Sequence, residues 1–430
     1  MNRPHSRTCR AIASRTPAPL WRLAKAGLAG TLLVRILAAQ GPISLPPHCP
    51  LHYLNTSFEN ASPLYWEIAP DGSVQIFLVY DQERDSPNRA NGHWHFQVQA
   101  RPGAKLTLVL NHLRNIWNGY PGNPASKHTV CRVSEDGRHW DVVPTEIISG
   151  DRLRFEIEMP ASGELYVAHL EPYRISDLER LMKEIRGHPR ARILPLGKTV
   201  QGRELSLIQV GRTDAPHSVL LRARAHPWES GGNWVVQGLI RALLRDEPAN
   251  RKYLACYTVY VLPMANLDGV AHGRTRFNQL GMDLNRKWDR PADPRLAPEN
   301  AALERWLRTM IAAGRKPDLA IDLHNDQHGQ LHISRPRIAL DAYLARMDRY
   351  EALLRRCTWF TEGRTGGNFH NPGSFGEGLL ERFGITAFVQ ELNANWIAGL
   401  NDHATGANWE LLGAQYREVF YRYFTAEDEK

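Results

Sequence analysis

The sequence has no long uninterrupted hydrophobic run and few cysteines, and both shortages exclude classes of protein. Nowhere in its 430 residues is there a run of the roughly eighteen uncharged apolar residues that a membrane-spanning helix needs, so a bundle of such helices is excluded. Its 5 cysteines exclude a disulfide-dense fold, and none lies in a CxxC pair of the kind that binds zinc. With 43% hydrophobic and 23% charged residues, the chain is not generically disordered. A water-soluble protein with room for two ordinary domains is expected.

Acidic residues are missing from the first forty positions, and this explains most of the net charge. The whole chain carries 53 Lys and Arg against 45 Asp and Glu, a formal charge of +8. Residues 1–40 contain seven basic side chains and no acidic one, which leaves about +1 for the rest of the chain. An extended basic surface is therefore not expected, and no nucleic-acid partner is predicted.

The N-terminal segment has the composition of a targeting leader. Its basic start is followed by an apolar stretch at 26–39, interrupted by Arg35, and then by a proline-rich joint at 41–47. This order predicts an export signal in residues 1–40 and a periplasmic or secreted protein. An organelle transit peptide and an untargeted tail on a cytoplasmic protein are the alternatives. Cleavage would remove Cys9 and leave four cysteines. This even number permits two disulfides, but buried free thiols are expected.

Apolar and polar residues alternate with period two from residue 51 to residue 170, and turn residues separate the segments. Strand-length segments of this kind lie at 73–80, 93–99, 105–110 and 152–159. Asp136-Gly137 lies between two further apolar segments, in the position of a hairpin turn. Several short strands at this spacing predict an N-terminal antiparallel β-sandwich domain over residues 51–170.

At residue 176 the hydrophobic period changes to that of a helix. Ser176 and Glu179 form a capping box, which predicts a helix start. Beyond it, short apolar strands at 218–221, 257–262, 318–322 and 385–389 alternate with helical segments at 234–244, 299–311 and 343–357. This alternation predicts an α/β domain over residues 171–430, with a mostly parallel mixed sheet and helices on both faces.

Polar residues follow the predicted strands of this sheet. His226 and Glu229 come after the first strand, His324 after the third and Glu391 after the fourth. Ligands of open α/β sheets bind at the carboxyl ends of the strands. These four side chains are therefore expected to meet at one edge of the sheet.

His226, Glu229 and His324 combine two imidazoles with one carboxylate. Three such ligands leave the fourth tetrahedral position of Zn²⁺ open for water, as in catalytic rather than structural zinc sites. The HxxE spacing alone carries little weight, because about one such pair is expected by chance among 18 histidines. A single strand-end histidine is also more often a hydrogen-bonded structural residue. The joint placement of the three residues is what indicates a metal site.

The segment 274–288 holds a second group of polar residues. Asn285 and Arg286 place an amide beside a guanidinium, a pair that can hold a carboxylate with bidentate geometry. A surface ion pair of Arg286 is the alternative. Asp283 is a candidate to accept the second ring hydrogen of His226, or else to cap a turn.

Five motifs, in this order, resemble the zinc metallocarboxypeptidases of the M14 type. They are HPWE at 226–229, NLDG at 266–269, GRTR…GMDLNRKW within 273–288, His324 and Glu391. The likeness covers residues 171–430, and the preceding β domain is similar to the N-terminal domain of the cytosolic carboxypeptidase branch. The resemblance implies one Zn²⁺ per chain, held by His226, Glu229 and His324. It further implies hydrolysis of the C-terminal peptide bond of peptides or proteins by a metal-activated water.

The same resemblance assigns roles to four further residues. Glu391 would be the general base, and Arg276 would polarise the scissile carbonyl. Asn285 and Arg286 would bind the substrate's terminal carboxylate. Two other functions stay open: a zinc amidase or deacylase acting on a carboxylate-bearing amide such as a cell-wall peptide, and an inactive peptide-binding module. Peptide or protein C-termini are the expected partners, no integral membrane domain is expected, and the oligomeric state is left open.

The loop before Glu391 departs from the family. The family's usual tyrosine is not apparent, and residues 366–376 offer Phe369, His370 and Phe375 instead, of which His370 is the polar candidate to replace it. Glycines in this loop predict a mobile cover over the site. Arg364 and Arg382 nearby suggest a pocket for an acidic C-terminal side chain, with solvated surface positions as the alternative.

Overall fold

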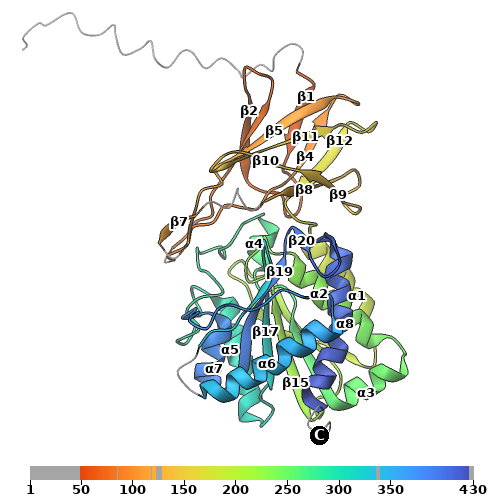
Figure 1. The fold of residues 1–430 in the computed structure, drawn as a ribbon, viewed down its shortest axis with the longest axis vertical. Helices are drawn as coiled ribbons and strands as arrows, with labels where there is room; N and C mark the ends of the chain where they lie inside the picture. The colour runs from red at the N-terminus through yellow and green to blue at the C-terminus, as the bar shows by residue number, and fades with distance from the viewer. Residues whose placement is uncertain (1–48, 85, 118, 123–127, 336–338, 426–430) are drawn as a thin grey trace, which may run out of the picture. The chain divides into compact units, whose positions relative to one another are not determined.

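The computed structural model describes residues 49–84, 86–117, 119–122, 128–335 and 339–425. The predicted leader at 1–40 lies outside these residues. Cys49 to Lys430 form one compact unit. Within it, a region rich in strands precedes a region in which helices surround a sheet (Figure 1). The predicted division into domains 51–170 and 171–430 stays a prediction.

The N-terminal region, residues 51–170, contains two five-stranded sheets. The first has the order β1 (Leu51–Asn55), β4 (His95–Ala100), β12 (Glu164–Ala168), β8 (Val130–Ser134) and β9 (Asp141–Pro144); the second has the order β10 (Glu146–Ser149), β11 (Arg152–Glu158), β5 (Lys105–Asn111), β3 (Val74–Leu78) and β2 (Leu64–Ile68). Alternate residues of most of these strands, such as Val74, Ile76 and Leu78, enter one shared apolar core. The predicted antiparallel sheets are confirmed, except that β3 and β5 run parallel.

The hairpins of the N-terminal region include two with short turns. The first joins β8 to β9 through Asp136 and Gly137, as predicted, and Gly137 takes the left-handed φ of +68° that this turn needs. The second joins β6 (Asn115–Trp117) to β7 (Tyr120–Gly122) and forms a separate two-stranded sheet.

The second region is built on a seven-stranded mixed sheet. Its order is β13 (Ala191–Lys198), β14 (Glu204–Val210), β16 (Tyr257–Leu262), β15 (His217–Ala223), β17 (Leu319–Asp326), β19 (Thr386–Asn393) and β18 (Gln330–His332). The four strands β16, β15, β17 and β19 are parallel, and the outer strands join them antiparallel. A short pair, β20 (Trp396–Ile397) and β21 (Asp402–His403), follows β19. The predicted fold class, a mostly parallel mixed sheet, is confirmed.

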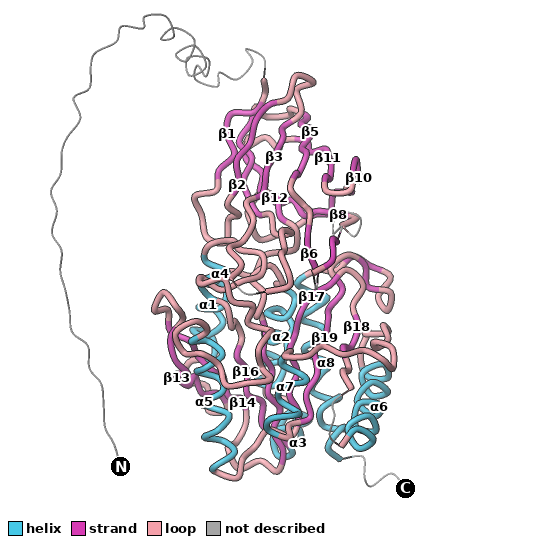
Figure 2. The backbone as a smooth tube through the Cα atoms, turned by 90° about the vertical axis from the view of Figure 1, so that its left-hand side faces the viewer, coloured by secondary structure: helices cyan, strands magenta, loops and turns pink. Residues whose placement is uncertain are grey.

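Helices cover both faces of this sheet (Figure 2). They are α1 (Ile175–Ile185), α2 (Gly231–Leu244), α3 (Pro248–Cys256), α4 (Leu267–Ala271), α5 (Pro298–Ala312), α6 (Leu340–Cys357), α7 (Phe375–Phe383) and α8 (Gly406–Thr425). One face, with Val219, Leu221 and Leu323, packs against α2, α6 and α8. The other, with Leu220 and Ala320, packs against α5 and α7. Because successive side chains of a strand point to opposite faces, these strands bury side chains on both faces of the sheet, as parallel sheets do.

Some local expectations need correction. Helix α1 begins at Ile175, one residue before the predicted cap, and its N-terminus is closed by the Asp177 carboxylate, which accepts from the backbone N of Arg174 at 2.8 Å. The four described cysteines are free thiols, but of these only Cys131 is fully buried.

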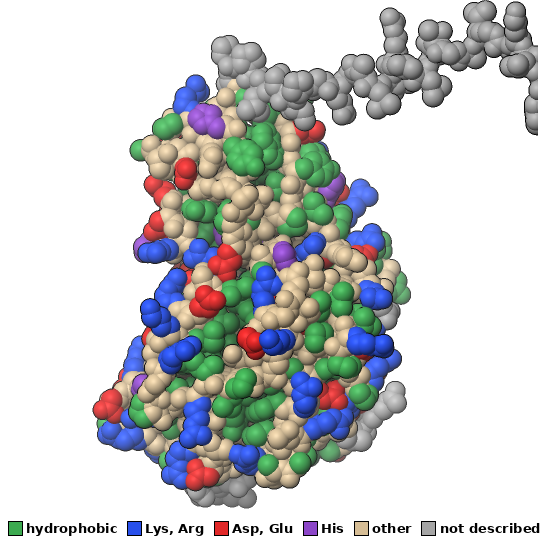
Figure 3. Space-filling model, turned by 180° about the vertical axis from the view of Figure 1, so that it is seen from behind, with side chains coloured by type: hydrophobic (Ala, Val, Ile, Leu, Met, Phe, Trp, Pro, Cys, Tyr) green, Lys and Arg blue, Asp and Glu red, His purple; other side chains and the backbone are tan. Residues whose placement is uncertain are grey.

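No described helix is both long and apolar enough to cross a bilayer. On the face seen in Figure 3, basic side chains are interspersed with acidic and apolar ones.

Candidate metal centre and active site

Parallel register brings the predicted site residues to one edge and one face of the sheet. Cα pairing places Arg222 of β15 opposite Asp322 of β17, and His324 opposite Glu391 of β19. Because side chains two residues apart on a strand share a face, Asp322, His324 and Glu391 all point to the same side. His226 joins them from the loop that follows β15.

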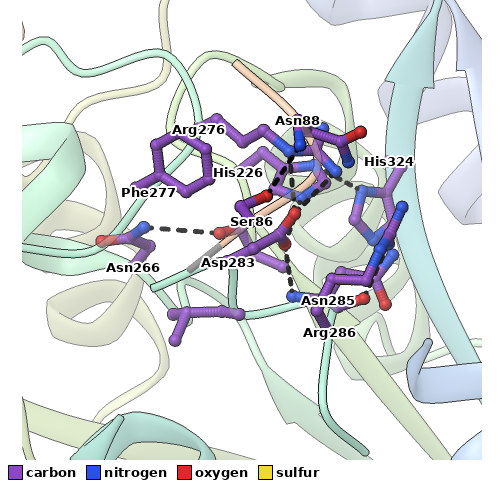
Figure 4. Close-up of polar contacts among 12 residues, drawn as sticks. Ser86, Asn88, His226, Asn266, Arg276, Phe277, Asp283, Asn285, Arg286 and His324 are labelled. Atoms are coloured by element: carbon purple, nitrogen blue, oxygen red, sulfur yellow. Dashed lines mark hydrogen bonds and ion pairs between the residues drawn. The ribbon is translucent and has the colours of Figure 1, made fainter. Parts of the chain in front are cut away.

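His226, Glu229 and His324 form a closed group with almost no exposure to solvent. Figure 4 labels its two histidines. The two carboxylate oxygens of Glu229 lie 2.8 Å from Nδ1 of His226 and 2.6 Å from Nδ1 of His324. The two Nδ1 atoms are 3.1 Å apart. Donor atoms around one tetrahedral zinc would be separated by roughly 3.3 Å, given bonds of about 2.0–2.1 Å. The three residues are therefore close to the spacing of a single metal site.

The chemistry of this group requires a cation. The outer nitrogen Nε2 of His226 lies 3.0 Å from Asp283, and that of His324 lies 2.7 Å from Asp322. If each Nε2–H donates to its carboxylate, both Nδ1 lone pairs turn inwards, towards the Glu229 carboxylate. Three acceptors then face one another with no donor between them. The residues present thus fit Zn²⁺, and the predicted contact of Asp283 with His226 is found.

The charges around this group also favour a proton on His324. Burial by itself would lower the pKa of His324, but the carboxylates of Asp322 and Glu229 outweigh burial and raise that pKa well above its ordinary value. Glu229 responds in the opposite direction: burial would raise its pKa, and the two imidazoles lower it below the usual range. Both shifts have the direction expected of a group that favours added positive charge.

Asp322 is itself held by a buried arginine. Nε of Arg222 donates to Oδ1 of Asp322 at 2.7 Å, and Nη2 pairs with Oδ2 of the same carboxylate. The guanidinium also lies over the ring of Phe375, 4.2 Å from its centroid. Arg222 and Asp322 are both fully buried, so the orientation of His324 is fixed by a bidentate ion pair beneath the site.

Glu391 lies beside the metal group on β19. Burial is the largest effect on its carboxyl group and raises the pKa well above the ordinary value. Nδ1 of His332, on the neighbouring strand β18, lies 3.6 Å from Oε1 of Glu391. The two residues are diagonal neighbours on the same face, because His332 pairs with Val389 in the antiparallel register.

Arg276, Asn285 and Arg286 surround Asp283 (Figure 4). Arg276 donates to Oδ2 of Asp283 at 2.8 Å, and the backbone N of Asn285 donates to Oδ1 at 2.9 Å. Oδ1 of Asn285 accepts from the backbone N of Phe375 at 2.9 Å, which leaves its amide nitrogen to donate. Burial lowers the pKa of Arg286. The carboxylates of Asp283 and Glu391 raise this pKa and the charge of Arg276 lowers it, but burial is the largest effect. The structure thus brings all seven predicted site residues together.

Comparison with known proteins identifies this region. The family model for zinc carboxypeptidase matches residues 178–330, which include all three residues of the metal group. The chain is therefore similar to the zinc carboxypeptidases over residues 178–330.

Known proteins resemble the chain in sequence and in fold. The chain is 26% identical to an uncharacterised protein of Zymomonas mobilis over 63% of its own length and 64% of that protein's. It is 31% identical to cytosolic carboxypeptidase 2 of Danio rerio over 32% of its length, which is 20% of the fish protein. The chain thus spans less than two thirds of these relatives. A crystal structure of a metallo-carboxypeptidase from Burkholderia cenocepacia has the same fold, with a TM-score of 0.75, 21% identity, and coverage of 87% of this chain and 99% of that one.

The loop that departs from the pattern of the zinc carboxypeptidases presents an aromatic ring to the site. Phe369 packs against His332 with ring centroids 4.9 Å apart, whereas His370 is exposed. Phe375 is buried in α7 beneath Arg222. Nothing in the structure brings His370 to Glu391, so it does not replace the family's tyrosine here.

The two arginines suggested for an acidic pocket are already paired. Arg364 forms ion pairs with Asp348 and Glu351, and Arg382 pairs with Glu304 at 2.6 Å. Both guanidinium groups are therefore committed to acids of this chain.

Sequence reasoning missed Asp322, His332 and Asp81, and each for its own reason. Asp322 precedes His324 by two residues in a strand, so period two could have revealed that both share a face. His332 lies in a strand of only three residues, too short to show a period. Asp81 bonds to residues nearly two hundred positions away, for which the sequence carries no signal.

Proposed function

We propose that this protein is a zinc-dependent metallocarboxypeptidase that hydrolyses the C-terminal peptide bond of peptides or proteins. One observation carries the proposal: the metal group of His226, Glu229 and His324 shares its edge and face of the sheet with Glu391. Zn²⁺ in this site would supply Lewis-acid chemistry and bring the pKa of a bound water to about 7.

Glu391 is assigned the role of general base. Its carboxylate lies on the same face as His324 and is only partly exposed, so it can take a proton from the attacking water and return it to the leaving amine. A pKa raised by burial supports that role, because the group must hold the proton between the two transfers. His332 and Phe369 restrict the space around this carboxylate.

Arg276, Asn285 and Arg286 supply the donors that a substrate with a free carboxylate needs. Arg276 is assigned to the carbonyl oxygen on which negative charge develops. The free amide nitrogen of Asn285 and the guanidinium of Arg286 are assigned to the terminal carboxylate. Binding at the terminus places the last peptide bond over the metal group, which makes cleavage exo rather than endo.

The test is the stepwise release of C-terminal residues, read by mass spectrometry, together with metal analysis. The wild type is expected to hold one zinc per chain and to shorten peptides from the C-terminus. Glu391→Gln is expected to keep the zinc and to lose about 10²–10⁴-fold in kcat. Glu418→Gln, a partly exposed position on α8, serves as the control and should leave kcat unchanged. A wild type without stoichiometric zinc and without residue release would refute the proposal.

The two alternative functions give different results in the same assay. A zinc amidase or deacylase would leave linear peptides intact and cleave a carboxylate-bearing amide such as a cell-wall peptide. An inactive binding module would retain peptide without shortening it. Among the described residues, no carboxylate lies within 4 Å of the Arg286 guanidinium. Its charge is therefore available to a substrate with a free carboxylate.

Export of the protein is proposed from residues 1–40 alone. The name of the cytosolic carboxypeptidases supports the cytoplasmic alternative. N-terminal sequencing of the native protein separates the two, because an intact Met1 contradicts both export and organelle targeting.

A further inference from the structure

The loop that carries Arg276 is fastened to the N-terminal region. Asp81, which follows β3, accepts hydrogen bonds from three consecutive backbone amides: those of Thr275 at 2.9 Å, Arg276 at 2.5 Å and Phe277 at 3.0 Å. The Asp81 side chain is buried, so this carboxylate is not shared with solvent. Three donors on one anion fix the main chain at the point where the Arg276 side chain leaves it.

Two further contacts hold the same loop. Oγ1 of Thr275 accepts from the backbone N of Gly92 and of His93, both at 3.3 Å. At the far end of the loop, the backbone N of Arg84 donates to the carbonyl of Gly281 at 3.0 Å. Gly281 has a φ of +78°, and a Cβ there would lie 2.7 Å from the carbonyl oxygen of Gln82. The loop is therefore shaped to lie against this part of the N-terminal region.

The guanidinium of Arg276 is held from two sides. Its Nε and Nη2 atoms each lie 2.8 Å from Oδ2 of Asp283, the residue that also bonds to His226. Its face lies over Trp117 of strand β6, with 5.1 Å from Cζ to the ring centroid. The Trp117 ring is wedged against Gly122 of β7, where a Cβ would lie 2.4 Å from the ring. Ser86 and Asn88 of the same N-terminal region are also drawn at this site (Figure 4).

We infer that the N-terminal region completes the active site: Asp81 and Trp117 are positioning residues that set the backbone and the guanidinium of Arg276. The inference rests on the proposed function. An oxyanion donor acts only at the position where charge develops, so a small displacement of Arg276 costs rate rather than substrate affinity. Because Asp283 joins Arg276 to His226, the same contacts also steady the imidazole.

The experiment measures kcat and KM for Asp81→Asn, Trp117→Leu and Trp117→Phe, alone and combined with Arg276→Ala. Asp81→Asn replaces one carboxylate oxygen by an amide group that faces backbone amides. It is expected to lower kcat about tenfold, with KM changing less than about threefold. Complete removal of an oxyanion donor costs roughly 10²–10³ in kcat, and a displaced Arg276 should lose a fraction of that. Trp117→Leu is expected to lower kcat about threefold, and Trp117→Phe to restore most of it. Asp136→Asn is the matched control, since Asp136 also accepts backbone amides, at 2.8 Å from Arg138 and His139, but in the β8–β9 turn.

The combined variants separate positioning from general destabilisation. If Asp81 acts through Arg276, Asp81→Asn is expected to change kcat less than about twofold once Arg276 is alanine. Equal losses in both backgrounds, with unchanged zinc content, would overturn the inference while leaving the proposed function intact.

A second readout does not depend on turnover. Hydrogen exchange of the amides of residues 275–277, and the reaction of Arg276 with phenylglyoxal followed by peptide mass spectrometry, are expected to rise at least tenfold in Asp81→Asn but not in Asp136→Asn. Faster exchange and labelling in a protein that cleaves no peptide would support the positioning and refute the proposed function. Unchanged exchange and labelling would refute the positioning whatever the activity.

Discussion

At the scale of single residues, Glu299 shows how a buried carboxyl group sets the pH dependence of stability. Its side chain is almost wholly buried at the start of α5 and accepts from Asn278 at 3.2 Å and from the backbone N of Val200 at 3.4 Å. Burial is the largest effect and raises its pKa to about 7, with a further contribution from the carboxylate of Asp268. Since the folded pKa exceeds the unfolded one, the fold binds this proton more tightly than the unfolded chain does.

Stability should therefore fall as the pH rises through the folded pKa. The contribution of Glu299 is fully present below pH 4.5 and lost by about pH 8, a change of about 3 kcal/mol in the free energy of unfolding. Glu299→Gln removes the ionisation, so the variant is expected to gain stability over the wild type at pH 8 and little at pH 5. Urea unfolding at both pH values measures the difference.

Glu304, one turn further along α5, is the control with the opposite sign. Burial would raise its pKa, but Arg382 and Arg308 lower it, so its charged form is favoured in the fold. Glu304→Gln is expected to destabilise the protein at pH 8. Parallel pH profiles of the wild type and Glu299→Gln would contradict the account of Glu299.

At the scale of elements, α2 and α8 pack so closely that glycine is required at their contact. A Cβ on Gly413 of α8 would lie 1.9 Å from the carbonyl oxygen of Val235 in α2, and one on Gly238 would lie 2.1 Å from that of Glu410. Both positions meet backbone rather than movable side chains. The two helices therefore approach through a pair of glycines, and a methyl group must push them apart.

Gly413→Ala is expected to lower the free energy of unfolding by about 1–3 kcal/mol or more, because overpacking forces the backbone to shift. Urea unfolding measures the loss. Gly363→Ala is the control, because its added Cβ would meet nothing nearer than the end of the Arg355 side chain at 3.5 Å. Equal stability of the two variants would show that the α2–α8 contact adjusts without cost.

Elements with a clean period were predictable from the sequence, and irregular ones were not. The four parallel strands and helices α2, α5 and α6 carry apolar residues at the spacing of their class and were located within a few residues. Strand β13 contains Pro195 and Gly197, which argue against a strand, and its register shifts between them. Its formation depends on pairing with β14, which no local pattern shows.

At the scale of the whole molecule, the metal residues were predictable because topology brings them together. Parallel strands end at one edge, so residues that follow different strands meet without any sequence contact. The contact of Asp81 with the 275–277 loop has no such rule, since it joins two loops that lie 194 to 196 positions apart in the sequence. The sequence therefore predicts the metal group but not the support that holds Arg276.

Metal removal is expected to destabilise the whole protein. Three acceptors converge on one point, and only bound positive charge relieves their repulsion. A metal at 1,000 times its Kd adds about 4 kcal/mol to the free energy of unfolding, so a chelator should lower Tm by several degrees, and added zinc should restore it.

The fall in Tm on addition of a chelator should be greater at pH 8.5 than at pH 6. In the metal-free protein the pKa of His324 is raised by Asp322 and Glu229, so a proton stabilises the group at low pH and that stability is lost as the pH rises through the folded pKa. Calorimetry with and without chelator at both pH values measures this, and Glu229→Gln, which removes one ligand charge, should respond much less. A wild type with the same Tm in chelator and in zinc would show that the group binds no metal in solution.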